Sequence, residues 1–307
     1  MPVVRINSVE SSPQLHGTSR PVWPTLRRLG RVPGPVIVMI HGYKYEPGHA
    51  RHCPHRHILS LHPAPLPDAW PRPLGFGANL PAADPHDEGL GIAFGWNARG
   101  ALWSAQARAR DAGRVLARVI GELHRLAPAR PVHIVAHSMG TEVALEALHH
   151  LPAGAVHRIL SLTGACYRSR TAMALATPAG QSAEFINVTS RENDPFDFLF
   201  ERLITPPQPG DRSIGQGLDG PGTVTLQLDC PERSITSAGS ACRWPRPGAA
   251  SAIGPPTPAP AFCRCTAPCC AGPMPFRWTR CAVACPPRPR RAGRGSSPCP
   301  QAPAACG

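Results

Sequence analysis

The chain has 307 residues, a hydrophobic fraction of 42% and a formal net charge of +13. This length suits one α/β domain of roughly 200–250 residues with an extension, and no run reaches the roughly 18 consecutive apolar residues that a membrane-spanning helix needs. The first twenty residues lack the apolar core of a signal peptide, so the expected location is cytoplasmic.

Charge and cysteine are both concentrated at the C-terminal end. Residues 231–307 carry ten arginines and one glutamate, so the rest of the chain is only mildly basic. That part does not interleave aromatic residues with arginines, as a nucleic-acid surface does, and we expect no nucleic-acid partner for it. Only Cys53 and Cys166 precede residue 230, out of 12 cysteines. This distribution argues against one disulfide framework for the whole chain.

The first predicted strand covers residues 36–40 and runs directly into residues 41–43, which are His, Gly and Tyr. Residues 45–88 are rich in Pro, His, Gly and Asp, and they predict a long irregular segment that serves as a lid or a substrate-facing loop. Residues 91–96 predict a second, buried strand.

A long amphipathic helix is predicted over residues 103–127, because its apolar side chains recur at intervals of three and four. These side chains are Ala112, Val115, Leu116, Val119, Ile120, Leu123 and Leu126. The next strand, residues 132–136, leads through a short turn into a helix over residues 141–151. Three more strands are predicted over residues 159–163, 185–188 and 224–228.

This alternation of strands and helices predicts an α/β fold with a mostly parallel central sheet flanked by helices. Reactive groups in such sheets gather beyond the carboxyl ends of the strands. Residues 1–31 are interpreted as an N-terminal extension and residues 32–230 as the folded domain. Residues 231–307 form a low-complexity tail rich in Pro, Arg and Cys, whose composition predicts disorder.

One pentapeptide in this order is typical of a nucleophile elbow, in which a strand turns sharply into a helix and holds a serine at the tip. The turn needs small side chains two residues before and after the serine. Ala136 and Gly140 meet this need around His137, Ser138 and Met139. The alternative interpretation is that Ser138 is an ordinary helix N-cap.

Over residues 32–230 the chain resembles the α/β-hydrolase superfamily, in three landmarks that come in the expected order. The loop His41-Gly42-Tyr43 is similar to the one that supplies an oxyanion-hole amide, and the elbow follows it. Residues 187–195, Asn-Val-Thr-Ser-Arg-Glu-Asn-Asp-Pro, are similar to the strand end that carries the catalytic acid. The expected fold is therefore the α/β-hydrolase fold.

The resemblance implies a serine hydrolase that acts on small carboxylic esters through an acyl-enzyme at Ser138, with no cofactor. The backbone N–H groups of Met139 and Tyr43 would stabilise the oxyanion. Asp194 would support a histidine that takes the serine proton. Glu192 and Asp197 are the competing candidates for this acid.

The remaining histidines of this region have other expected roles. His41 is expected to shape the oxyanion loop, and His137 to point away from the serine and pack. The run in the irregular segment has no spacing typical of a compact metal site, and we expect no metal there. Its members are His49, His52, Cys53, His55, His57 and His62.

The histidine that should follow Asp194 is missing, because the last histidine of this chain is His157. One hypothesis is a frameshift near residues 230–234. If the codons permit, the neighbouring frame reads Leu-Asp-His-Leu-Arg-Arg-Leu-Gly-Leu-Pro-Leu over residues 234–244 and His-Trp-Ser-Ser-Tyr over residues 252–257. Two alternatives remain: a non-catalytic binding protein with the hydrolase fold, and a protein whose basic tail binds an acidic partner. The oligomeric state is not indicated.

Overall fold

A computed structural model describes residues 2–31, 34–62, 69–76 and 89–229. These residues form an eight-stranded sheet in the order β2-β1-β4-β3-β5-β6-β7-β8, in which only the β1–β2 pair is antiparallel. The strands are β1 Val3–Val9, β2 Ser12–Leu15, β3 Val36–Ile40, β4 Leu90–Gly95, β5 Val132–His137, β6 Arg158–Leu162, β7 Glu184–Thr189 and β8 Thr223–Gln227. The predicted α/β-hydrolase fold with its mostly parallel sheet is confirmed.

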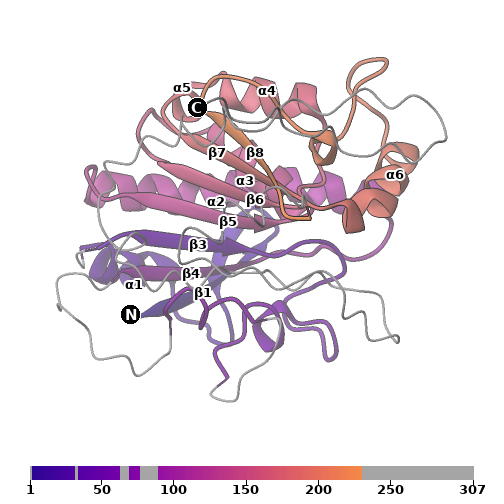
Figure 1. Ribbon diagram of the computed structural model, residues 1–307. Helices are drawn as coiled ribbons and strands as arrows, with labels where there is room; N and C mark the ends of the chain where they lie inside the picture. The colour runs from indigo at the N-terminus through magenta and orange to yellow at the C-terminus, as the bar shows by residue number, and fades with distance from the viewer. Residues whose placement is uncertain (1, 32–33, 63–68, 77–88, 230–307) are drawn as a thin grey trace, which may run out of the picture. The chain divides into compact units, whose positions relative to one another are not determined.

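Helices connect these strands and pack largely on one face of the sheet (Figure 1). They are α1 Val22–Leu29, α2 Leu102–Leu126, α3 Gly140–Leu148, α4 Arg168–Leu175, α5 Pro178–Gln181 and α6 Asp194–Leu203. Short 3-10 turns cover Pro54–Arg56, Arg191–Asn193 and Ile214–Gln216. No helix within the described residues is long and apolar enough to span a membrane.

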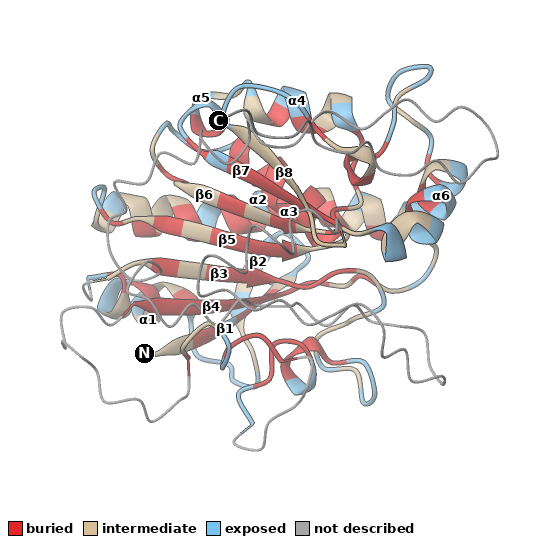
Figure 2. Cartoon of the chain, viewed as in Figure 1, coloured by how far each residue is buried: buried red, intermediate tan, exposed pale blue. Residues whose placement is uncertain are grey.

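The main core lies between the sheet and the paired helices α2 and α3, and Figure 2 colours many residues of the central strands and of these helices as buried. The apolar stripe predicted for α2 forms part of this core, and Leu116, Val119 and Ile120 are fully buried. Every residue of α3 is buried, including its two glutamates. This helix follows directly after Ser138, so the core fixes the position of the serine.

The second face of the sheet is covered at β3 and β4 by the segment between these two strands. Ile58, Leu59, Trp70 and Phe76 pack there on Met39 and its neighbours. The described residues of the segment predicted to be an irregular lid therefore supply a second, smaller core. The sequence did not predict this role, because the segment is rich in proline and histidine and its four apolar residues follow neither the helical nor the strand period.

Farther along the same face, two apolar rows cross strands β5 to β8. The parallel register aligns Val135 with Leu160, Ile186 and Val224, and it aligns His137 with Leu162, Val188 and Leu226. Paired residues of neighbouring strands point to the same side. Val135 belongs to the second core, with Leu160 and Leu162 packed against it, whereas Val224 and Leu226 of β8 are only half-buried.

The N-terminal residues belong to the same sheet and core. β1 pairs with β4, and Val4 and Ile6 of β1 and Leu26 of α1 are buried with the helices. The boundary drawn at residue 31 therefore separates no structural unit. Because β1 lies next to β4, which follows 81 residues later, this pairing has no local signal in the sequence.

Candidate functional site

Ser138 stands at the sharp turn between β5 and α3. Its φ is +51°, in the left-handed region, where a non-glycine residue stores of order 1–3 kcal/mol of strain. Its N–H donates to the Leu162 carbonyl at 2.9 Å, and its own carbonyl accepts from the N–H groups of Thr141 and Ala165, both at 3.1 Å. Bonds to β6, to α3 and to the loop after β6 thus hold the serine backbone in this conformation.

Small residues let the loop after β3 lie directly against this turn. A Cβ on Gly140 would come within 2.6 Å of the His41 carbonyl oxygen. A Cβ on Gly42 would meet both Ser138 Cβ and His137 Nδ1 at 2.9 Å. The neighbouring atoms lie too close to either position for any residue larger than glycine. Gly42 thereby places the loop of residues 41–43 beside the serine side chain.

Replacing Gly42 with alanine is expected to displace this loop or Ser138, because the new methyl group has no space. We expect a loss of about 1–3 kcal/mol in the free energy of unfolding, measured by chemical denaturation. Gly121→Ala is the matched control, since a Cβ there meets its nearest neighbour at 3.9 Å and alanine favours the α2 helix. Equal stability of Gly42→Ala and the parent would contradict the packing argument.

His41 holds the loop in place and is unsuited to act as a base. Its Nδ1 lies 2.9 Å from the Gly42 carbonyl oxygen, and the Trp96 backbone N–H donates to its Nε2 at 3.0 Å. The Trp96 indole N–H also donates to the His41 carbonyl at 3.0 Å, and the two rings stack. Burial lowers the pKa of His41 to about 4. The ring is therefore neutral at neutral pH, with both nitrogens engaged.

Two backbone amides beside Ser138 have no acceptor within the described residues. They belong to Met139, just before the first residue of α3, and to Tyr43 in the loop after β3. The first N–H groups of a helix lack intrahelical partners and carry partial positive charge. The Tyr43 hydroxyl donates to the Gly100 carbonyl and anchors the loop. This arrangement suits a negative oxygen on a group bound at Ser138.

The three candidate acids lie at the start of α6 and differ in exposure. Glu192 is exposed, Asp194 is the half-buried first residue of α6, and Asp197 is buried. Burial is the largest cause that raises the pKa of Asp197, to about 7. A carboxyl group that holds its proton up to that pH is a poor partner for a charged imidazole, so the structure favours Asp194 over Asp197.

Asp197 predicts a pH dependence of stability. Its folded pKa of about 7 lies above the ordinary 3.8, so the folded state binds more protons between these values and stability falls as pH rises through this window. Asp197→Asn removes the ionisation. The free energy of unfolding of the variant should therefore rise relative to that of the parent between pH 5 and pH 8, by up to ~3 kcal/mol. Denaturant unfolding at both pH values measures the gain. Parallel curves for parent and variant would refute it, and exposed Asp111→Asn serves as control.

No histidine ring hydrogen-bonds to the Ser138 hydroxyl within the described residues. His137, next in sequence, lies edge-on to the Trp70 ring at 6.2 Å, and burial lowers its pKa to about 4. His157, the last histidine, accepts the Val132 N–H at 3.3 Å, at the amino end of β5. The shortage of a base seen in the sequence therefore persists in the described part of the structure.

The histidines of the irregular segment have structural partners. His55 is buried and bonded to Asn7 Oδ1 at 2.7 Å, His57 is bonded to the Arg51 carbonyl, and His49 lies beside His52. Among the described residues, no group of three or more His, Cys, Asp and Glu side chains is arranged to hold a metal ion.

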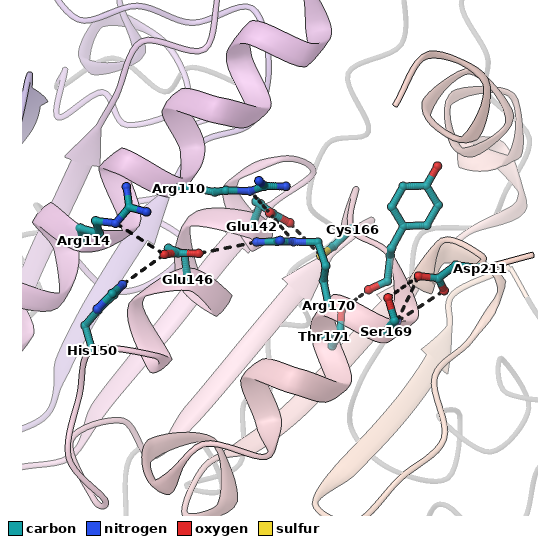
Figure 3. A network of polar contacts seen from close by, with 11 residues as sticks. Arg110, Arg114, Glu142, Glu146, His150, Cys166, Ser169, Arg170, Thr171 and Asp211 are labelled. Atoms are coloured by element: carbon teal, nitrogen blue, oxygen red, sulfur yellow. Dashed lines mark hydrogen bonds and ion pairs between the residues drawn. The ribbon is translucent and has the colours of Figure 1, made fainter. Parts of the chain in front are cut away.

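A polar network that was not predicted from the sequence links α3 to α2 and α4 (Figure 3). Arg110 of α2 and Arg170 of α4 pair with the buried carboxylate of Glu142 at 3.2 and 2.7 Å. The Cys166 thiol donates to the same carboxylate at 2.9 Å, and burial raises the pKa of this thiol well above its ordinary value. The network ties α3 to the helices on either side. The one part of this network that the sequence indicates is the charged Glu142 in α3, four residues after Ser138.

Comparison with known protein families supports the fold. Residues 28–165 match a family described as "Alpha/beta hydrolase of unknown function (DUF900)". The match includes β3, the loop after it, the elbow and α3, and it ends before the candidate acids. No curated protein matches the chain in sequence.

Proposed function

We propose that the chain is a serine hydrolase of carboxylic esters whose nucleophile is Ser138. Its fold and the match of residues 28–165 to an α/β-hydrolase family support this proposal. The observation that carries the proposal is the left-handed Ser138 with the amides of Met139 and Tyr43 beside it. Backbone strain at a strand-to-helix turn exposes a nucleophile at its tip. An ordinary helix N-cap residue has extended backbone, so the φ of Ser138 speaks against that alternative.

The reaction would proceed in two displacements. The Ser138 oxygen attacks the acyl carbon as its proton passes to a base, and the two amides stabilise the resulting oxyanion, each worth about 3 kcal/mol of barrier. The base then protonates the departing alcohol and leaves an acyl-serine. Water, deprotonated by the same base, releases the carboxylic acid and restores the serine. Asp194 would orient the base.

A fluorophosphonate probe tests the role of Ser138. It should label the chain slowly and selectively at Ser138, as mapped by peptide mass spectrometry, and Ser138→Ala should remove the label. Ser161→Ala is the control, because this nearby serine is buried and bonded to Thr141. Labelling that persists in Ser138→Ala would overturn the proposal. A chain that takes no label but retains ligand binding would favour the non-catalytic alternative.

The base, on this proposal, belongs to a C-terminal region whose reading frame was shifted near residues 230–234. Two structural features support this origin. The Asp229 carboxylate accepts the Arg191 N–H at 2.8 Å, so the chain leaves β8 beside the loop that carries Asp194. Val224 and Leu226 of β8 are also only half-buried, and the neighbouring frame can encode an amphipathic helix that would cover them. Residues 231–307 themselves, including the basic tail, lie outside the described residues.

A further inference from the structure

A cavity of about 510 Å³ opens at the β1 side of the sheet, away from the proposed ester site. It is lined by Arg5, His55, Arg56, Ser60, Leu61 and His62. Arg5 comes from the face of β1 opposite α2, and the others come from the segment between β3 and β4. β4 and β3 lie between β1 and β5, so three strand spacings, roughly 14 Å, separate β1 from the strand that carries Ser138.

The positive charge of this cavity is not neutralised within the described residues. Neither Arg5 nor Arg56 forms an ion pair there, whereas Arg110 and Arg170 both reach carboxylates. The charged neighbours that lower the pKa of His16, beside the cavity, are Arg5 and Arg56 themselves, after burial as the main cause. Among the residues that the structure describes, no carboxylate lines the cavity. Two solvent-exposed arginines therefore line the cavity without a carboxylate partner among the described residues.

The floor of the cavity is firmly built. His55 is bonded to Asn7 through Nε2, and its ring lies 4.1 Å from that of His16. Its second nitrogen, Nδ1, is buried and has no partner among the described residues, and a buried polar atom of this kind requires one. Burial lowers the pKa of His55 to about 2, so this ring is neutral and adds no charge to the cavity.

A hydrogen-bond donor completes the lining. The Ser60 hydroxyl oxygen accepts the His62 N–H at 3.1 Å, which directs the hydroxyl hydrogen elsewhere. The segment itself is anchored because the neighbouring Ile58 and Leu59 are buried in the second core. Two guanidinium forks and one hydroxyl donor match the oxygens of a tetrahedral dianion, which Arg binds through paired hydrogen bonds.

We propose that this cavity binds the phosphate group of a small phosphate monoester. Charge, donor set and volume carry the proposal: two arginines balance a dianion, and the space exceeds that of phosphate alone, which leaves room for an organic remainder. The site is independent of Ser138, so its failure and the failure of the proposed esterase are separately observable.

Isothermal titration of the full chain at low ionic strength, with inorganic phosphate and with glycerol 3-phosphate, tests this site. Both should bind, the ester more tightly, and Arg56→Gln should weaken each at least tenfold. Arg28→Gln, an exposed arginine of α1 outside the cavity, should leave both affinities within twofold. The double variant Arg5→Gln/Arg56→Gln should abolish binding, with circular dichroism to verify its fold.

Three results would overturn the proposal. They are no binding of either compound to the parent chain, an unchanged affinity in Arg56→Gln, and equal competition by chloride at the same concentration. Tight binding of inorganic phosphate with no gain from the glycerol moiety would refute the monoester and identify free phosphate as the ligand. If the double variant does not fold, Arg56→Gln and Ser60→Ala decide the outcome, since Arg56 is exposed and serine to alanine removes only one hydroxyl.

Discussion

Replacing Glu142 with alanine is expected to lower the free energy of unfolding by about 1–3 kcal/mol. The Glu142 side chain is 1% exposed and is the shared partner of Arg110, Arg170 and the Cys166 thiol. Its removal takes the carboxylate from Arg110, whose side chain is 38% exposed, and leaves Arg170 with only the longer contact to Glu146 at 3.6 Å. Breaking a buried pair from one side costs more than an exposed ion pair contributes, because the partners left behind stay partly desolvated.

Equilibrium unfolding in urea measures this loss. Glu184→Ala is the matched control, because its carboxylate pairs with Arg158 but is 52% exposed, and exposed pairs contribute about 1 kcal/mol or less. Glu142→Gln should lie between the two, since the amide oxygen still accepts from the thiol. A loss under 1 kcal/mol in Glu142→Ala would show that solvent or another carboxylate replaces the missing group.

The same substitution should reach the proposed nucleophile. Cys166 follows Ala165, whose N–H donates to the Ser138 carbonyl, so the Glu142 carboxylate helps to fix the loop that holds the strained serine. The network therefore joins two properties of this fold. It stabilises the contact between α3 and its neighbouring helices, and it maintains the backbone conformation on which the chemistry at Ser138 would depend.

The features that were predictable from the sequence are local ones. The strand, the turn at Ser138 and the helix after it follow from a β-branched run, small residues and an apolar stripe within twenty residues. The loop at Gly42 was predictable only through resemblance, because nothing near it in the sequence shows that its missing Cβ makes room for Ser138. That requirement arises from a contact across 96 positions.

The features that were missed depend on contacts between distant segments. β1 joins the sheet through β4, and Trp70 packs on the sheet from a segment whose composition predicts a loop. Trp96 supports His41 through a backbone and a side-chain bond, and no spacing rule indicates this pair. The raised pKa of Asp197 likewise follows from burial against Gly215, which the position of Asp197 after a strand does not reveal.

Restoring the neighbouring reading frame after residue 230 is expected to raise kcat/KM for a short-chain 4-nitrophenyl ester by about 10⁴-fold or more. This is the order of rate lost when the histidine of a serine triad is removed, while the oxyanion hole alone retains roughly 10³–10⁴-fold over water. The restored helix should also cover the half-buried Val224 and Leu226 of β8. Burial of apolar area stabilises by about 25 cal/mol per Å², so the melting temperature should rise together with the activity.

Steady-state hydrolysis and thermal unfolding of both chains check this expectation, and their combination separates its parts. Ser138→Ala in the restored chain should return activity to that of the present chain while the melting temperature stays raised. Alanine in place of the histidine of His-Trp-Ser-Ser-Tyr, which the restored frame encodes, should do the same. If the restored chain is more stable but inactive, the covering helix is supported and the catalytic base is refuted. Activity that survives Ser138→Ala would reject the nucleophile, because the acyl group would then have no attachment at the turn after β5.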